Sequence, residues 1–129
     1  MSAGRFRKTW DASPWLRREL QHYVHALMVQ ITQTAACNRF HTVDARLARW
    51  LLMMRDRVCS GEFQLTHKFL ARMLGVRRVG VTDAASGLQQ RELIIYRRGN
   101  IRIIDHVALE SAACSCYKRI ARRRHAGGW

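Results

Sequence analysis

The chain has 129 residues, of which 48% are hydrophobic, so it has the size and composition of one ordinary domain with a buried core. Lys and Arg number 23 against 9 Asp and Glu, and the formal net charge at pH 7 is +14. This charge attracts polyanions, of which nucleic acids and anionic membranes are the most abundant. No apolar run approaches the roughly 20 residues that span a bilayer, and the N-terminus lacks the apolar region of a secretory signal. We therefore expect a cytoplasmic protein without a membrane partner.

The N-terminal third is predicted to be an arm followed by a long helix. Residues 1–13 are basic and lack periodicity, so we expect a flexible basic arm. Ser13 and Pro14 then indicate a helix start, because serine caps free backbone N–H groups and proline suits the first helical position. We expect the helix to continue to about Phe40, within a segment of residues 14–41.

One face of this long helix has the spacing of a coiled coil. Its positions alternate in steps of four and three, and they are Leu20, Val24, Leu27, Ile31, Thr34 and Asn38. The stripe predicts dimerisation, and therefore a homodimer. The alternative is that the stripe packs on the rest of the same chain.

A second helix is predicted from about Val43 to Cys59. Its apolar positions recur at spacings of three and four, and they are Leu47, Trp50, Leu51 and Met54. Ser60 and Gly61 should end this helix, with glycine in the left-handed conformation. We expect residues 42–117 to form one domain that begins with this helix.

The segment LTHKFLARMLGVRRVGVTDAASGLQQREL, which begins at Leu65, predicts a helix-turn-helix. Thr66 is a suitable N-cap for its first helix. The motif needs a small residue where the helices cross, a glycine in the turn and an inward aliphatic residue on the second helix. Ala71, Gly75 and Val81 meet these needs at intervals of four and six residues.

The second helix of this motif is predicted to have a core side and a DNA side. At 100° per residue the inward cluster consists of Val81, Ala84, Ala85 and Leu88. The predicted DNA-contacting residues of the motif are Thr66, Arg77, Arg78, Val79, Thr82, Asp83 and Ser86. The alternative is that this side is only the solvated face of a helix.

Arg78 is the main candidate for base readout, because arginine can donate two hydrogen bonds to guanine. Arg77 is expected to bind a phosphate, and Thr82 a base or a backbone oxygen. Val79 can contact a thymine methyl group, and Asp83 can accept from the amino group of cytosine.

Gly80 and Gly87 are unusual inside a helix, where each costs about 1 kcal/mol relative to alanine. They lie one heptad apart on one side. We infer that the preceding helix or a DNA strand approaches the backbone closely there.

The next segment, LIIYRRGNIRIIDH, predicts two short strands joined by a tight turn at Arg98, Gly99 and Asn100. This hairpin would be the wing of a winged helix-turn-helix. Arg97, Arg98 and Arg102 are expected to meet phosphates or the minor groove. The alternative is a hairpin that only caps the core.

The C-terminal segment is predicted to be one helix from Val107 to Arg124, and residues 118–129 to form a basic tail. The four cysteines, Cys37, Cys59, Cys114 and Cys116, are expected to be reduced. Cys114 and Cys116 could bind a soft metal, but no second pair and no histidine at ligand spacing accompany them. We expect them to be small apolar residues inside a helix, and we expect no metal and no cofactor.

From about Trp15 to Tyr117 the chain resembles the Crp/Fnr family of bacterial transcription regulators. The resemblance lies in AACNRFHTVDARLARWLLMMRDRV, LTHKFLARMLGVRRVGVT and LIIYRRGNIRIID. It implies a mainly α fold with a small β wing, in which a long dimerisation helix precedes the winged helix-turn-helix. In that family the long helix follows an N-terminal effector-binding β-roll, which we expect to be missing here. Cyclic-nucleotide binding and an iron–sulfur cluster are therefore not expected.

The family's commonest base-reading pattern, Arg-Glu-x-x-x-Arg, falls on Arg78, Val79 and Asp83, and only Arg78 keeps its type. We therefore expect a sequence-specific regulator that binds double-stranded DNA in the major groove and reads its own operator. RNA polymerase is a further candidate partner.

The alternatives are a nonspecific nucleic-acid-coating protein and a partner that forms heterodimers with full-length regulators. An enzyme is not expected, because the histidines and carboxylates form no set of nucleophile, base and orienting group.

Overall fold

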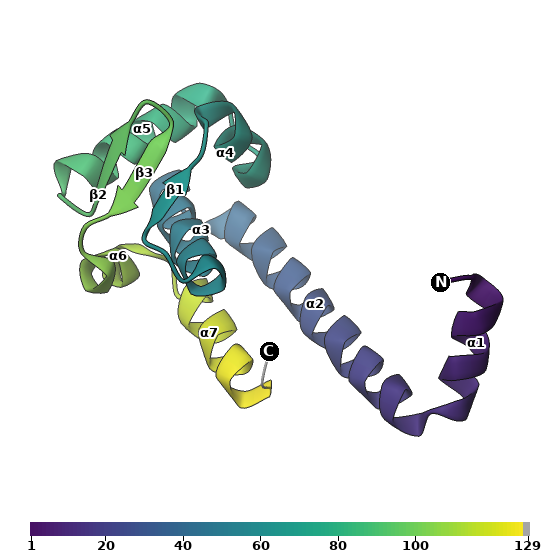
Figure 1. The fold of residues 1–129 in the computed structure, drawn as a ribbon. Coiled ribbons are helices and arrows are strands. Elements are labelled where there is room, and N and C mark those ends of the chain that lie inside the picture. The colour runs from purple at the N-terminus through teal and green to yellow at the C-terminus, as the bar shows by residue number, and fades with distance from the viewer. Residues whose placement is uncertain (128–129) are drawn as a thin grey trace. The chain divides into compact units, whose positions relative to one another are not determined.

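The computed structural model describes residues 1–127, and side chains up to residue 123. Seven helices are described (Figure 1): α1 (Ala3–Ala12), α2 (Pro14–Phe40), α3 (Val43–Val58), α4 (His67–Leu74), α5 (Arg78–Gln90), α6 (His106–Ala112) and α7 (Cys116–Gly127). Three strands form one antiparallel sheet in the order β1-β3-β2, with β1 (Glu62–Gln64), β2 (Ile94–Arg97) and β3 (Asn100–Ile103). The predicted mainly α class with a small β wing is confirmed. Among the described residues, no helix is both long and apolar enough to cross a membrane.

The chain divides into two compact units, Met1–Gln33 and Thr34–Trp129. In the first unit most of the expected flexible basic arm, residues 1–13, forms helix α1, which the sequence did not predict. Ser2 caps this helix by accepting a hydrogen bond from the Arg5 N–H at 3.4 Å. The rings of Phe6 and Trp10, one turn apart, have centroids 6.0 Å apart. One aromatic pair is too short a pattern for periodicity to reveal.

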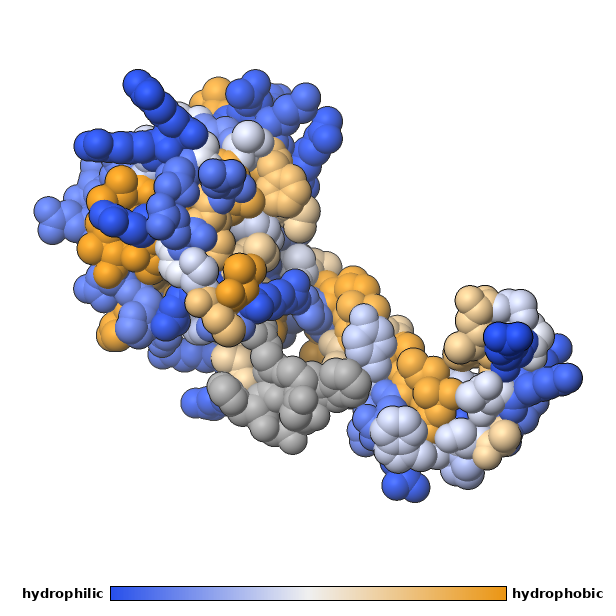
Figure 2. Space-filling model, viewed as in Figure 1, coloured by the Kyte–Doolittle hydropathy of each residue, from blue (hydrophilic) through white to orange (hydrophobic). Residues whose placement is uncertain are grey.

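Helix α2 begins and ends where the sequence predicts. The Ser13 side chain accepts a hydrogen bond from the Leu16 N–H at 3.2 Å, and Pro14 is the first helical residue. Six large apolar side chains between residues 15 and 31 are exposed: Trp15, Tyr23, Val24, Leu27, Met28 and Ile31. Hydrophobic residues along α2 are visible in Figure 2. The helix therefore presents apolar surface that a partner could cover.

The core of the second unit forms around α3, against which α5 and α6 pack. Leu47 and Leu51 of α3 are fully buried, as are Leu88 of α5, Ile101 of β3 and Leu109 of α6. The inward residues of α5 and the sheet thus share one apolar cluster with α3. This packing fixes which side of α5 faces solvent.

The segment after α3 differs from the prediction in two ways. Cys59, at φ 54°, takes the left-handed conformation expected of glycine, and its N–H bonds the Arg55 carbonyl at 2.8 Å. Gly61 then precedes strand β1, which the sequence did not predict. Phe63 of β1 is buried opposite Ile101 of β3. A strand of three residues shows no readable alternation, so only its pairing with β3 defines it.

The predicted hairpin of β2 and β3 is present. Arg98 at φ 47° and Gly99 at φ 78° form its two-residue turn, and Arg97 pairs with Asn100. Positive φ at both central positions is typical of a type I′ turn, whose twist matches that of the strands.

Two arginines of α3 are buried. Arg46 is 5% exposed and donates a hydrogen bond to the carbonyl oxygen of Leu74, the last residue of α4. Arg49 is 4% exposed, and its Nη1 lies 3.5 Å from Thr34 Oγ1. Arg46 therefore caps the C-terminal end of α4, where backbone carbonyls lack helical partners.

The single C-terminal helix predicted from Val107 to Arg124 is in fact two helices, α6 and α7. Ala113, at φ −69° and ψ 153°, is extended and ends α6. After this break Tyr117 is buried, and its hydroxyl donates to Asp56 Oδ2 of α3 at 3.0 Å. The predicted basic tail is largely helix α7, and its last two residues, 128–129, lie outside the described residues.

Three cysteines form a small cluster apart from the main core. Cys37, Cys114 and Cys116 are buried, with Ala45 packed against them. Cys114 lies between α6 and α7, so the expectation that it is inside a helix is wrong. Burial is the main cause that raises the pKa of the Cys37 thiol to about 12; the Cys114 thiol adds to this rise and the charge of Arg49 opposes it.

Neither helical glycine of α5 is required by close packing within the chain. A Cβ on Gly80 would lie 3.8 Å from the nearest Val76 carbon, an ordinary contact, and one on Gly87 would meet nothing within 4 Å. Of the two expected close approaches, that of the preceding helix is therefore wrong, and that of a DNA strand stays a prediction. We expect Gly87→Ala to raise the free energy of unfolding by about 0.5–1 kcal/mol, because alanine has the higher helix propensity. Urea denaturation measures the change.

Gly75→Ala is the matched control, because Gly75 lies at φ 65° and the same substitution there should destabilise the protein. Equal effects of the two substitutions would contradict the assignment of conformational roles to these glycines.

Candidate nucleic-acid interface

Helices α4 and α5 form the predicted helix-turn-helix. Thr66 caps α4 by accepting from the Phe69 N–H at 3.1 Å. Gly75 ends α4 in the left-handed conformation. Ala71 and Val81 are buried, as the motif requires of the helix crossing and of the inward position on the second helix. The three positions that predicted the motif therefore have the predicted conformation and burial.

The two sides of α5 are divided as the sequence predicts. Its buried residues are Val81, Ala84, Ala85 and Leu88. The ten residues predicted to contact DNA are all exposed: Thr66, Arg77, Arg78, Val79, Thr82, Asp83, Ser86, Arg97, Arg98 and Arg102. Figure 2 shows hydrophilic side chains gathered where α4, α5 and the β2–β3 hairpin lie in Figure 1. Solvent reaches every predicted contact residue.

A shallow, wide-open basic groove lies between α4 and the first turn of α5. Its volume is about 650 Å³, and it is lined by Lys68, Ala71, Arg72, Gly75, Val76, Arg77, Arg78 and Val79. Four of these side chains are cationic, and the N-terminus of α5 adds the positive end of a helix dipole. Free N–H groups and positive charge at a helix start are suited to an anion such as a phosphate.

Lys68 and Arg72 of the basic groove were not among the predicted contacts. They lie one turn apart on α4 and are exposed. Their spacing of four residues is visible in the sequence and indicates one cationic side of α4. The sequence prediction included Thr66 at the start of the first helix, the second helix and the hairpin, but not the exposed side of the first helix.

Thr82 is less free to contact DNA than its exposure suggests. Its hydroxyl donates to the Arg78 carbonyl at 3.0 Å and lies 2.9 Å from His67 Nδ1. Because the Thr82 hydroxyl donates its proton to the Arg78 carbonyl, the Thr82 oxygen is the acceptor in the second contact. His67 Nδ1 therefore donates to it. Thr82 thus joins α5 to α4, and one lone pair of its hydroxyl oxygen remains to accept a hydrogen bond from a ligand.

His67 is a structural residue of the candidate interface that the sequence did not single out. Its ring centroid lies 4.4 Å from that of Tyr96, whose hydroxyl donates to the Leu65 carbonyl at 3.1 Å. Burial, and to a smaller extent the charge of Arg78, lower the pKa of His67. The neutral imidazole therefore connects the start of α4, α5 and β2.

The three predicted wing arginines do not lie together. Arg97 and Arg98 are at the hairpin turn. Arg102 is farther along β3, paired with Ile95 on one side and Glu62 on the other. The turn therefore presents two of the arginines, and Arg102 belongs to the outward face of the sheet.

The chain matches the family model of the Crp-like helix-turn-helix domain over residues 45–112, just over half of its length. No curated protein matches it. Its fold resembles that of a protein described as a Crp/Fnr-family transcriptional regulator from Eubacterium rectale, with 22% identity, a TM-score of 0.70 and coverage of 85% of this chain and 51% of the other.

Two transcriptional regulators from Thermus thermophilus have the same fold. One, of the CRP/FNR family, has 20% identity, a TM-score of 0.72 and coverage of 78% and 55% of the two chains. The other, of the CRP family, has 23% identity, a TM-score of 0.64 and coverage of 76% and 53%. The chain thus spans about half the length of these solved structures. On the family match, the protein belongs to the Crp-like helix-turn-helix domain family.

Proposed function

We propose that this protein is a dimeric, sequence-specific DNA-binding transcription regulator whose helix α5 enters the major groove. The observation that carries the proposal is the exposed side of α5, which continues into the basic groove at its first turn. This arrangement occurs in a helix-turn-helix of a family whose solved relatives are described as transcriptional regulators. A helix-turn-helix places the N-terminal residues of its second helix against base edges.

In the proposed complex, cationic side chains position the protein on the phosphates, and other side chains read the bases. Lys68, Arg72 and Arg77 bind phosphates, which attract cations regardless of sequence. Arg78 donates two hydrogen bonds to a guanine, and Val79, which is 69% exposed, contacts a thymine methyl group. Because Val79 and Asp83 differ from the Glu and Arg of the family pattern, the operator differs from that of relatives which keep them.

The remaining predicted contacts lie outside the first turn of α5. Thr66, at the start of α4, binds a backbone oxygen, and Asp83 and Ser86 complete the exposed side of α5. Arg97 and Arg98 of the hairpin turn meet phosphates beside the bound groove. Arg102 contributes mainly to the positive field, because it lies away from the turn.

Residues 14–41 serve as the dimerisation segment in this proposal, and residues 42–117 as the DNA-binding domain. The support is the row of exposed apolar side chains on α2, which includes Val24, Leu27 and Ile31. A twofold dimer of helix-turn-helix domains reads two half-sites about 34 Å apart, one turn of DNA. The expected operator is therefore a palindrome.

A nonspecific nucleic-acid-coating protein is the second candidate, and the net charge of +14 favours it. Such a protein binds through phosphates alone. It requires the basic groove but not a reading role for Arg78.

We expect Arg78→Ala to weaken binding to an operator selected from a random DNA pool by about 5- to 150-fold, because a bidentate arginine–guanine contact contributes about 1–3 kcal/mol of discrimination. Preference at one base pair should relax. Repeating the selection with the variant measures both effects. Arg91→Ala removes the same charge at the other end of α5 and should preserve the preference. An operator preference that Arg78→Ala leaves unaltered would contradict the reading role.

Binding to the selected operator should weaken about a thousandfold or more between 50 and 200 mM salt if roughly 6 to 10 phosphates are contacted, because counterions are released on binding. Titration of labelled duplexes by fluorescence anisotropy measures this dependence. A random duplex of equal length is the control. Equal affinity for both duplexes at every salt concentration would favour the coating protein over the specific regulator.

We expect Ile31→Asp to convert the dimer into monomers, because it places a charge in an apolar seam. Ile31 is 59% exposed in the single chain. Ala26→Asp adds the same charge on another side of α2 and should leave the dimer intact. Analytical ultracentrifugation measures the oligomeric state of both variants. A parent chain that is monomeric alone, and that captures a full-length regulator in a pull-down, would support heterodimers instead.

A further inference from the structure

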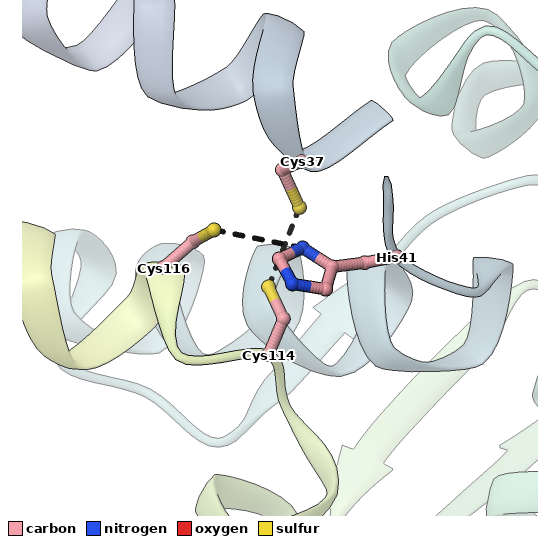
Figure 3. Close-up of side chains that lie close together, drawn as sticks. All are labelled: Cys37, His41, Cys114 and Cys116. Atoms are coloured by element: carbon pink, nitrogen blue, oxygen red, sulfur yellow. Dashed lines mark hydrogen bonds between the residues drawn. The ribbon is translucent and has the colours of Figure 1, made fainter. Parts of the chain in front are cut away.

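Three cysteines and one histidine meet in the second unit although they come from two distant parts of the sequence. Cys37 and His41 lie one turn apart at the end of α2, and Cys114 and Cys116 flank the turn into α7. Figure 3 shows the four side chains pointing toward one another. Cys37 Sγ lies 3.3 Å from Cys114 Sγ, Cys116 Sγ lies 3.6 Å from His41 Nδ1, and all four ligand atoms lie within 4.8 Å of one another.

These distances fit four ligands of one metal ion better than they fit a disulfide or the ligands of an iron–sulfur cluster. A disulfide requires an S–S distance of about 2.05 Å. An iron–sulfur cluster places several iron and sulfide atoms between its ligands and so spreads them farther apart than a single ion does. A tetrahedral Zn²⁺ with Zn–S bonds of about 2.3 Å and a Zn–N bond of about 2.0 Å has ligands about 3.5–3.8 Å apart. The Cys37–Cys114 and Cys116–His41 distances are close to this spacing.

Burial and charge also suit a metal ion. All three cysteines are buried, and His41 is half-buried. Three thiolates and a neutral imidazole around Zn²⁺ carry a net charge of −1, which needs a nearby cation. Arg49 is 4% exposed and its charge acts on Cys37. Within the described residues no carboxylate is shown paired with the Arg49 guanidinium, whose Nε lacks a hydrogen-bond partner. An anionic zinc centre would balance this buried charge.

We propose that Cys37, His41, Cys114 and Cys116 form a structural zinc site. Three cysteines and one histidine are an established ligand set for structural zinc, and soft thiolates favour it over magnesium or calcium. Four protein ligands fill the tetrahedron and leave no position for a substrate. The expectation of no metal rested on the lone Cys-Ser-Cys pair, to which the fold adds Cys37 and His41.

The zinc ion would connect the end of α2 directly to the chain between α6 and α7. The three cysteines form an apolar cluster of their own with Ala45, separate from the main core around α3. Coordination ties residues 37–41, at the end of α2, to the connection between α6 and α7. A crosslink between segments so far apart in sequence stabilises the folded state strongly, because the site does not exist in the unfolded chain. This role is independent of the proposed DNA binding.

The first experiment measures metal in the full chain, purified without a histidine tag or added metal. We expect one zinc per chain by inductively coupled plasma mass spectrometry. After removal of zinc with a chelator under reducing conditions, Co²⁺ should restore one ion per chain and produce the visible absorption bands of tetrahedral thiolate coordination. A reduced chain that binds neither Zn²⁺ nor Co²⁺ would overturn the proposal, whether or not Cys37 and Cys114 form a disulfide on oxidation.

The second experiment assigns the ligands. Cys116→Ser should lose zinc or bind it at least tenfold more weakly in competition with a chelator. Cys59→Ser is the matched control, because Cys59 is exposed and outside the cluster. In the folded parent chain, zinc should protect three thiols from a thiol reagent and leave Cys59 reactive, a readout that does not require the variants to fold. Full reactivity of all four thiols in zinc-loaded protein, or equal zinc loss in both variants, would refute the assigned ligands.

Discussion

The packing of α5 against α3 is the contact on which the proposed DNA-binding surface depends. Val81 and Leu88 are fully buried in the cluster that contains Leu47 and Leu51 of α3. Because an α-helix is rigid and has 3.6 residues per turn, burial of one side determines which side chains remain on the other. Arg78, Val79 and Asp83 are thus exposed as a consequence of apolar packing. The free energy that keeps these three side chains on the exposed side comes from the buried residues on the opposite side of the helix.

Polar contacts then fix α4 relative to α5. Arg46 reaches from α3 to the carbonyl at the end of α4, and Thr82 of α5 hydrogen-bonds His67 at the start of α4. These contacts act at both ends of a helix of only eight residues, which is too short to be stable alone. They hold the cationic side chains of α4 beside the first turn of α5. The basic groove is therefore a product of the whole motif and not of one helix.

The cysteine and histidine cluster acts on a different part of the fold. It lies where the end of α2 meets the α6–α7 connection, and its own apolar cluster consists of three cysteines and Ala45, which are all small. Small cysteine side chains bury little area, so packing alone stabilises this junction weakly. A metal ion bound there would stabilise this junction by coordination, in addition to the small hydrophobic contribution of the cysteines. The proposed zinc site and the proposed DNA-binding surface thus lie at separate places in the same unit.

Local signals in the sequence determined the helix boundaries around Ser13, Thr66 and Gly75, the two sides of α5, the hairpin turn and the positive charge. Each depends on residues within one or two turns of each other, so spacing and residue type suffice. Tertiary structure alone decided strand β1, the break before α7, the burial of Arg46 and Arg49, and the meeting of Cys37 with Cys114. These features depend on contacts between segments far apart in the chain. Such contacts form only when the core brings the segments together, and no local pattern encodes them.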